Sequence, residues 1–141
     1  YDSYMKNNLL PEVWGPSGWR FMHYVALGYP DEPTEHDRMS YKRFYESLVD
    51  VLPCQGCANH YKENIAHVPI DDHLKDRESL LRWTFDIHNE VNKLKGKSIL
   101  SYEDALKLYT QKQFPVLDVL CKVLVLLAIL VFLYFLILHK Q

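Results

Sequence analysis

Apolar residues recur at helical spacing along most of the chain. In the clearest case, one stripe of a helix predicted at about 78–94 carries side chains three or four positions apart: Leu80, Thr84, Ile87, Val91 and Leu94. A similar stripe predicts a helix at about 35–51. The sequence has no convincing run of the alternating apolar and polar positions that half-buried strands require. We therefore expect an all-α fold.

Helix-starting and helix-ending residues divide the part before residue 115 into four helices and a short fifth. The first helix is expected to begin at Pro16 or Ser17 and to end at about Tyr29, and Thr34 caps the second. Pro53 precedes the third helix, at about 54–66. Gly96 follows the fourth, and Ser101 caps the fifth. The expected architecture is a helical bundle.

The composition changes sharply at Pro115. Residues 123–138 form an unbroken apolar run of 16, and 116–138 make a stretch of 23. At about 1.5 Å per residue, this stretch can cross a hydrocarbon core of ~30 Å. We therefore expect a single-pass C-terminal transmembrane helix at 116–138, with the remainder of the chain in the cytosol. Cys121 lies at the expected membrane edge, and three interpretations of it are open. It is a small apolar residue of the anchor, a palmitoylation site, or half of an intermolecular disulfide.

Charge and composition narrow the function classes. The net charge is −2 and no basic block stands out, so we expect no nucleic-acid binding. Aromatic residues make up 13% of the chain, with ten Tyr and three Trp. Such a content fits either an aromatic core or a site that encloses a flat ligand.

Two of the three cysteines form a Cys54-Gln55-Gly56-Cys57 motif at the start of the third predicted helix. Free N–H groups at a helix start favour the thiolate, which is the reactive form of cysteine. The motif therefore indicates a redox site. A zinc site is the main alternative, with Cys54, Cys57 and His60 as ligands and His67 or His73 as a fourth. The second ligand pair typical of zinc sites is not evident.

Aromatic and imidazole side chains share faces on two predicted helices. Trp19 and His23 are four positions apart, as are His88 and Asn92, with Trp83 about one turn earlier. Each of these residues by itself is common in an ordinary core. Together with a redox dithiol, they fit a flat cofactor with polar edges that accepts electrons, as a flavin does.

Four ordered motifs cover residues 14–110: Trp14-Gly15-Pro16-x-x-Trp19-x-x-x-His23, then Tyr29-Pro30-Asp31-Glu32-Pro33-Thr34, then Pro53-Cys54-x-x-Cys57-x-x-His60-Tyr61, and Trp83-x-x-x-x-His88-Asn89-Glu90-Val91-Asn92-x-x-x-x-Lys97. In order and spacing they resemble the Erv/ALR family of flavin-linked sulfhydryl oxidases. The Trp-Gly-Pro form looks like that of members from large DNA viruses.

The resemblance implies a four-helix bundle plus a short fifth helix that binds FAD, usually as a homodimer. It implies an N-terminal extension at 1–13 and an oxidase domain at 14–112, before the anchor. The implied reaction converts two thiols and O2 into a disulfide and hydrogen peroxide. Cys57 would lie beside the flavin, and Cys54 would exchange with the incoming thiol.

The resemblance also implies the residues that line the FAD site. These are Gly15, Pro16, Trp19, His23, Cys57, His60, Trp83, His88, Asn89, Val91, Asn92, Lys97 and Tyr109.

The chain departs from the family pattern in two respects. Many members carry a further shuttle pair of cysteines, which three cysteines do not allow. We therefore expect an external dithiol protein, thioredoxin-like or a small shuttle protein, as electron donor, with O2 as acceptor. The family usually has Leu where this chain has Lys95. The alternative functions are a membrane-anchored zinc-binding adaptor and a non-catalytic interaction module.

Overall fold

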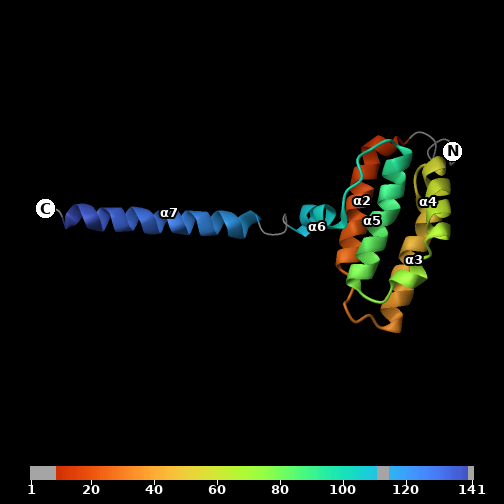
Figure 1. Cartoon of the computed structure of the whole chain (residues 1–141), viewed down its shortest axis with the longest axis horizontal. Helices are drawn as coiled ribbons and strands as arrows, with labels where there is room; N and C mark the ends of the chain where they lie inside the picture. Colours follow the sequence, from red (N-terminus) through yellow and green to blue (C-terminus); the bar gives the residue numbers. More distant parts are fainter. Residues whose placement is uncertain (1–8, 111–114, 140–141) are drawn as a thin grey trace. The chain divides into compact units, whose positions relative to one another are not determined.

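The computed structural model describes residues 9–110 and 115–139, and all regular elements in these ranges are helical. The expected all-α fold is thus confirmed for the described residues. The elements are α2 (Pro11–Leu27), α3 (Glu35–Val51), α4 (Gln55–His67), the 3-10 helix η1 (Ile70–His73), α5 (Arg77–Leu94), α6 (Tyr102–Thr110) and α7 (Pro115–Leu138) (Figure 1). The chain divides into two compact units between residues 105 and 106.

Helix α5 is the centre of the first unit. It packs against α2, α4 and η1, while α3 packs against α4 (Figure 1). Five of its side chains are no more than 2% exposed: Leu80, Leu81, Trp83, Thr84 and Ile87. Burial of the four large apolar side chains among them is the main favourable contribution to folding. The predicted stripe of the fourth helix is therefore largely buried.

The second predicted helix, α3, has the expected bounds because its start is defined locally. The Thr34 hydroxyl accepts from the Asp37 backbone N–H at 3.2 Å, and the Asp37 carboxylate accepts from the Thr34 N–H at 2.9 Å. This reciprocal capping box satisfies two backbone donors that the helix leaves unpaired. The hydrogen bonds from Thr34 also lower the pKa of the Asp37 carboxyl.

Helix α2 begins five residues earlier than the sequence indicated. Pro11 occupies its first turn, and Pro16 lies inside the helix. The predicted start at Pro16 or Ser17 is therefore wrong. From the sequence, either proline could stand in the first turn of a helix, where no backbone N–H is needed. In the structure Pro11 does so, and Pro16 lies in the second turn, where its missing N–H removes one intrahelical hydrogen bond.

The later boundaries follow the prediction more closely. Asp76 caps α5 by accepting from the Ser79 N–H at 2.7 Å. Gly96 follows the end of α5 with a φ of 62°, a left-handed conformation that glycine adopts without strain. Ser101 caps α6 by accepting from the Asp104 N–H at 3.1 Å. The 3-10 helix η1 was not predicted.

Buried tyrosines connect the helices through their hydroxyl groups. The Tyr45 hydroxyl donates to the Met22 carbonyl of α2 at 2.8 Å, and the Tyr61 hydroxyl of α4 donates to the Tyr45 carbonyl at 3.1 Å. Burial raises the pKa of both phenols, so they stay protonated and keep donating. Three helices are thus linked by two satisfied buried polar groups.

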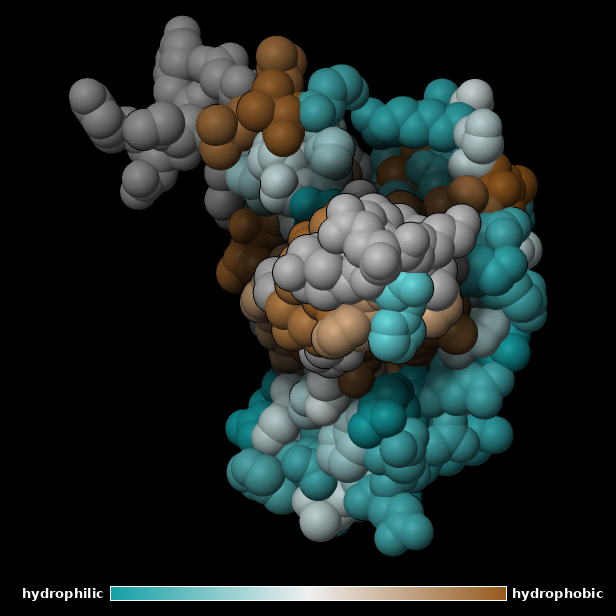
Figure 2. All heavy atoms as spheres, turned by 90° about the vertical axis from the view of Figure 1, so that its left-hand side faces the viewer, coloured by the Kyte–Doolittle hydropathy of each residue, from teal (hydrophilic) through white to brown (hydrophobic). Residues whose placement is uncertain are grey.

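Helix α7 coincides with the stretch at 116–138 that was predicted as a membrane anchor. Its described large apolar side chains, such as Leu124 and Phe132, are exposed, and in Figure 2, which shows the helix end-on, most of its coloured residues are brown. Among the residues that the structure describes, no helix is long and apolar enough to cross a membrane. The helix is confirmed, whereas its membrane crossing is not supported.

The role of the buried hydroxyls can be measured with Tyr45→Phe. The substitution removes the hydrogen bond to the Met22 carbonyl and keeps the ring, so the free energy of unfolding should fall by about 1 kcal/mol. Ser47→Ala is the control, because the Ser47 hydroxyl also donates to a carbonyl, that of Phe44, but from an exposed position. Urea denaturation followed by circular dichroism gives both values, and equal losses would contradict the prediction.

Candidate active site

The two cysteines of the motif form a disulfide at the start of α4. Cys54 is the N-cap residue, and its sulfur accepts from the Cys57 backbone N–H at 3.2 Å. Both side chains are half-buried. The helix start places backbone N–H groups near the Cys54 sulfur, which favours its thiolate when the pair is reduced. The third cysteine, Cys121, is exposed on α7 and free.

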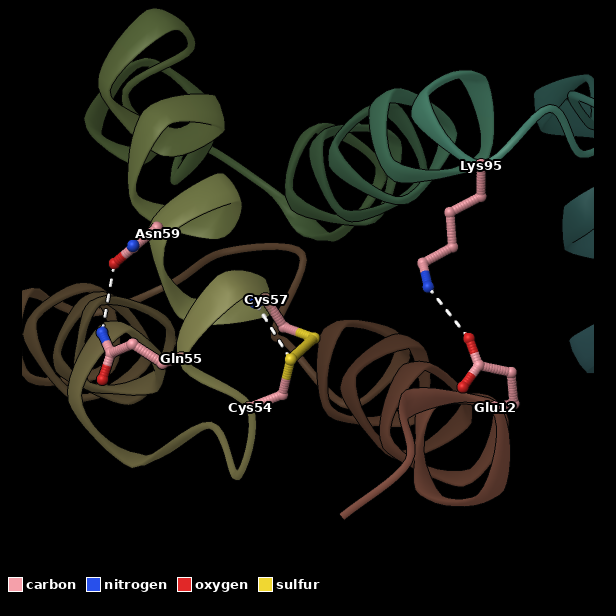
Figure 3. The surroundings of a disulfide bond; sticks show 6 residues. All are labelled: Glu12, Cys54, Gln55, Cys57, Asn59 and Lys95. Atoms are coloured by element: carbon pink, nitrogen blue, oxygen red, sulfur yellow. Dashed lines mark hydrogen bonds and ion pairs between the residues drawn. A yellow bond between two sulfur atoms is a disulfide. The ribbon is translucent and has the colours of Figure 1, made fainter. Parts of the chain in front are cut away.

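An ion pair links α2 to α5 in the neighbourhood of the disulfide (Figure 3). The Lys95 ammonium donates to the Glu12 carboxylate at 3.1 Å, joining the end of α5 to the start of α2. A backbone hydrogen bond lowers the pKa of Glu12, and Lys95 and Lys97 lower it further. Two lysines therefore lie close to this end of the bundle. Lys95, which departs from the family pattern, has a structural partner.

Trp19, His23 and His88 form one cluster between α2 and α5. The Trp19 and His88 rings stack with centroids 4.2 Å apart and planes inclined by 7°. His23 Nε2 lies 3.0 Å from His88 Nδ1. The sequence placed these residues on two separate helix faces, and the structure brings the two faces together.

Both imidazoles of this cluster are neutral near pH 7. Burial lowers the pKa of His23 to about 3, with a further contribution from His88. Burial also lowers the pKa of His88 to about 4, and the charge of Lys97 adds to the effect. The cluster therefore offers hydrogen-bonding groups without carrying a charge of its own.

Trp83 belongs to the core. It is 1% exposed, and its Nε1–H donates to the Val68 carbonyl at 2.8 Å. Its ring meets that of Tyr45 edge to face, with centroids 5.3 Å apart. Together with Trp19, it lines a narrow interior gap of the bundle. The predicted contact of Trp83 with FAD remains a prediction.

The motif at the end of α5 organises the loop that follows. The Asn89 amide donates to the Leu100 carbonyl at 3.0 Å and accepts from the Leu100 N–H at 3.3 Å. The Asn92 carbonyl accepts from the Lys97 N–H at 2.8 Å. These bonds hold Lys97 close enough to His88 and Glu12 to lower the pKa of each. Val91, on the same helix, is half-buried.

The remaining predicted residues lie at several places. Gly15 is half-buried on α2, and a Cβ atom added to it would meet no other atom within 4 Å. Pro16 beside it is exposed. His60 is exposed on α4, one turn after Cys57. Tyr109 lies on α6, at a position within the second unit. For these four residues, a role at the FAD site remains a prediction.

Two residues outside the predicted set also offer polar groups, Trp14 on α2 and Thr84 on α5. Trp14 Nε1 is a buried donor that has no acceptor among the described residues. Such a donor points to a group that these residues do not supply. The Thr84 hydroxyl lies 3.2 Å from His23 Nδ1. The sequence signal that could have identified Thr84 is its hydroxyl within the apolar stripe of the fourth predicted helix, four positions before His88.

The site offers several features to a ligand. Stacked rings, neutral imidazoles and an unpaired indole N–H suit a flat molecule with hydrogen-bonding edges, and the Lys97 ammonium suits a negative charge. Across residues 9–110 and 115–139, no group of three or more His, Cys, Asp or Glu side chains is arranged to hold a metal ion. These features favour a flat anionic ligand in a domain that also carries the Cys54–Cys57 disulfide.

Comparison with known proteins places this arrangement in a family. Residues 16–115 match the model of the Erv1/Alr family. A probable FAD-linked sulfhydryl oxidase of Acanthamoeba polyphaga mimivirus is 47% identical over 98 residues, which are 69% of this chain and 68% of that protein. An FAD-linked sulfhydryl oxidase of African swine fever virus is 31% identical, over 70% of this chain and 81% of its own length.

The fold agrees with this relationship. The crystal structure of the yeast Erv1 core is similar with a TM-score of 0.69 and 28% identity, over 75% of this chain and 88% of that one. The family match covers both the helix start that holds the disulfide and the helices that carry the Trp19–His88 stack. The chain therefore belongs to the Erv1/Alr family.

Proposed function

We propose that this protein is an FAD-linked sulfhydryl oxidase, which converts two thiols and O2 into a disulfide and hydrogen peroxide. The observation that carries the proposal is the Cys54–Cys57 disulfide on the first turn of α4, within an Erv1/Alr fold. The named relatives from mimivirus and African swine fever virus support the activity.

The features of the site fit FAD. Bound FAD supplies an acceptor for two electrons, which it passes on to O2. The Trp19–His88 stack suits the flat ring systems, and the unpaired Trp14 N–H suits a carbonyl or hydroxyl acceptor. Lys97, held beside His88 by the loop after α5, suits the pyrophosphate because ammonium groups bind phosphate oxygens.

We assign the exchange with substrate to Cys54. An incoming thiolate attacks the Cys54 sulfur, the Cys54–Cys57 bond breaks, and Cys57 leaves as a thiolate. A second substrate thiolate then attacks the substrate sulfur of the mixed disulfide and releases Cys54. The substrate leaves as a disulfide, and two electrons remain on the cysteine pair. The position of Cys54 as the N-cap supports this role, because the N–H of Cys57 stabilises its thiolate.

We assign Cys57, in the first turn of α4, to the cofactor side of the pair. The substrate class is a dithiol carried by a separate protein, thioredoxin-like or a small shuttle protein, which brings two thiols to Cys54 in succession. The half-buried position of Cys54 supports access by such a thiol.

A visible spectrum tests the cofactor. The full chain purified in mild detergent should be yellow, with flavin bands that bleach under anaerobic dithiothreitol and return when air is admitted. Recovery in air follows because O2 removes the electrons that the dithiol supplied. A colourless protein that contains stoichiometric zinc would refute the oxidase and favour a zinc-binding adaptor.

The role of Cys57 is tested by Cys57→Ser in the full chain. This variant should retain the flavin spectrum but lose oxygen consumption with a dithiol substrate to near background, because the internal disulfide cannot form. Cys121→Ser is the matched control and should consume oxygen at the unmodified rate, since Cys121 lies on α7 outside the pair. Continued turnover by Cys57→Ser, measured with an oxygen electrode, would overturn the assignment.

We further propose that the protein forms a homodimer attached to a membrane through residues 116–138. Exposed Val13, Phe21 and Tyr24 on α2 support a dimer contact, and the apolar run of α7 supports the attachment. The full chain should float with phospholipid vesicles and sediment in detergent as a dimer. A monomer in the sedimentation experiment would contradict the homodimer. A chain that stays at the bottom of the flotation gradient, apart from the vesicles, would contradict the membrane attachment.

A further inference from the structure

A chain of hydrogen bonds runs from the backbone of α5 through His23 of α2 and back to His88 of α5. The Thr84 hydroxyl donates to the Leu81 carbonyl at 2.8 Å. Thr84 Oγ1 lies 3.2 Å from His23 Nδ1, and His23 Nε2 lies 3.0 Å from His88 Nδ1. Four groups are thus connected in series.

The direction of the hydrogen bonds is set at the Thr84 end. A hydroxyl has one hydrogen to donate, and two oxygens 2.8 Å apart require that hydrogen between them. The Thr84 hydroxyl hydrogen is therefore used on the Leu81 carbonyl. Thr84 Oγ1 can then act toward His23 only as an acceptor, so that His23 Nδ1 must carry the hydrogen.

The same logic continues to His88. A neutral imidazole has one N–H and one lone pair, so His23 with a hydrogen on Nδ1 has an unprotonated Nε2. This nitrogen accepts from His88 Nδ1, which must therefore carry the hydrogen of that ring. His88 Nε2 is left with a lone pair.

Burial protects this arrangement from exchange with water. His23 is 0% exposed and Thr84 is 2% exposed, so solvent does not compete for their polar atoms. The lowered pKa values of His23 and His88 agree with two neutral rings. His88 itself is half-buried and stacked on Trp19, at the outer end of the series.

We propose that Thr84 is a positioning residue, which sets the tautomer of His88 through His23 so that His88 Nε2 accepts a hydrogen bond from the bound cofactor. The cofactor half of this inference rests on the proposed function, whereas the tautomer of His88 is a property of the chain by itself. Thr84 touches neither substrate nor reacting atoms in this role.

The tautomer selects which part of a dinucleotide lies at His88. An unprotonated Nε2 attracts a hydroxyl, amino or ring N–H donor and repels phosphate oxygens, which also carry lone pairs. The pyrophosphate then belongs beside the ammonium group of Lys97. His88 discriminates a donor edge of the cofactor from its anionic part.

The experiment compares Thr84→Val with Thr84→Ser in the full chain. Valine keeps the shape but removes the hydroxyl that accepts from the buried His23 Nδ1–H, which is costly. Both rings should then switch tautomer, with His23 Nε2–H donating to His88 Nδ1, so that His88 Nε2 becomes a donor. Serine keeps the hydroxyl and should keep the original tautomers.

Two readouts are needed. Nitrogen-15 NMR of the histidine rings distinguishes protonated from unprotonated ring nitrogens, and His88→Gln identifies the His88 signals among the seven histidines. In the FAD-free unmodified chain and Thr84→Ser, His88 should carry its hydrogen on Nδ1, and in Thr84→Val on Nε2. FAD should bind Thr84→Val about tenfold more weakly than Thr84→Ser, the loss of roughly one hydrogen bond.

The outcomes separate the two proposals. A His88 hydrogen on Nε2 in the unmodified chain overturns the inference, even if Thr84→Val fails to fold. The same His88 tautomer in all three folded proteins also overturns it. Equal FAD affinities of Thr84→Val and Thr84→Ser, with switched tautomers, overturn its cofactor half. Absence of FAD binding to the unmodified chain overturns the proposed function but leaves the tautomer to be decided by NMR.

Discussion

The burial of one face of α5 supports both the bundle and its site. Leu80, Trp83 and Ile87 lie on that face and are almost completely enclosed by α2, α4 and η1. A single helix thus carries the centre of the core and, one turn further, the ring of His88. Positions on a well-packed helix are held with little freedom, so the core determines where the imidazole lies.

The same burial imposes a condition on the polar groups around it. A buried donor or acceptor without a partner is costly, and the phenols of Tyr45 and Tyr61 meet this condition by donating to backbone carbonyls. His23 and His88 meet it by bonding to each other and to Thr84. Because desolvation disfavours charge, these imidazoles stay neutral, and the stability of the bundle and the chemistry of the cluster have one cause.

The disulfide obeys a more local rule. Cys54 caps α4 and Cys57 lies three residues later, so the bond and the helix start need no distant residue to form. The ion pair near the disulfide is not local, because Glu12 and Lys95 come from the two ends of the first unit's sequence. An exposed pair of this kind contributes little to stability. Its consequence is to hold the end of α5, and with it the start of the loop that carries Lys97, against the start of α2.

Features that depend on neighbours within a turn were readable from the sequence. The all-helical character, the Thr34 cap of α3, the cysteine motif at a helix start and the glycine after α5 all follow from spacings of three or four residues. The start of α2 was misplaced because Pro11 and Pro16 both satisfy the same local rule, and the choice depends on how far the helix extends. The tertiary structure decided what joins across the sequence: His23 to His88 over 65 positions, Thr84 to His23 over 61, and Glu12 to Lys95 over 83. No periodicity specifies which face of α2 meets which face of α5, since that depends on side-chain packing between the helices, and the hydrogen-bond series exists only once they are packed.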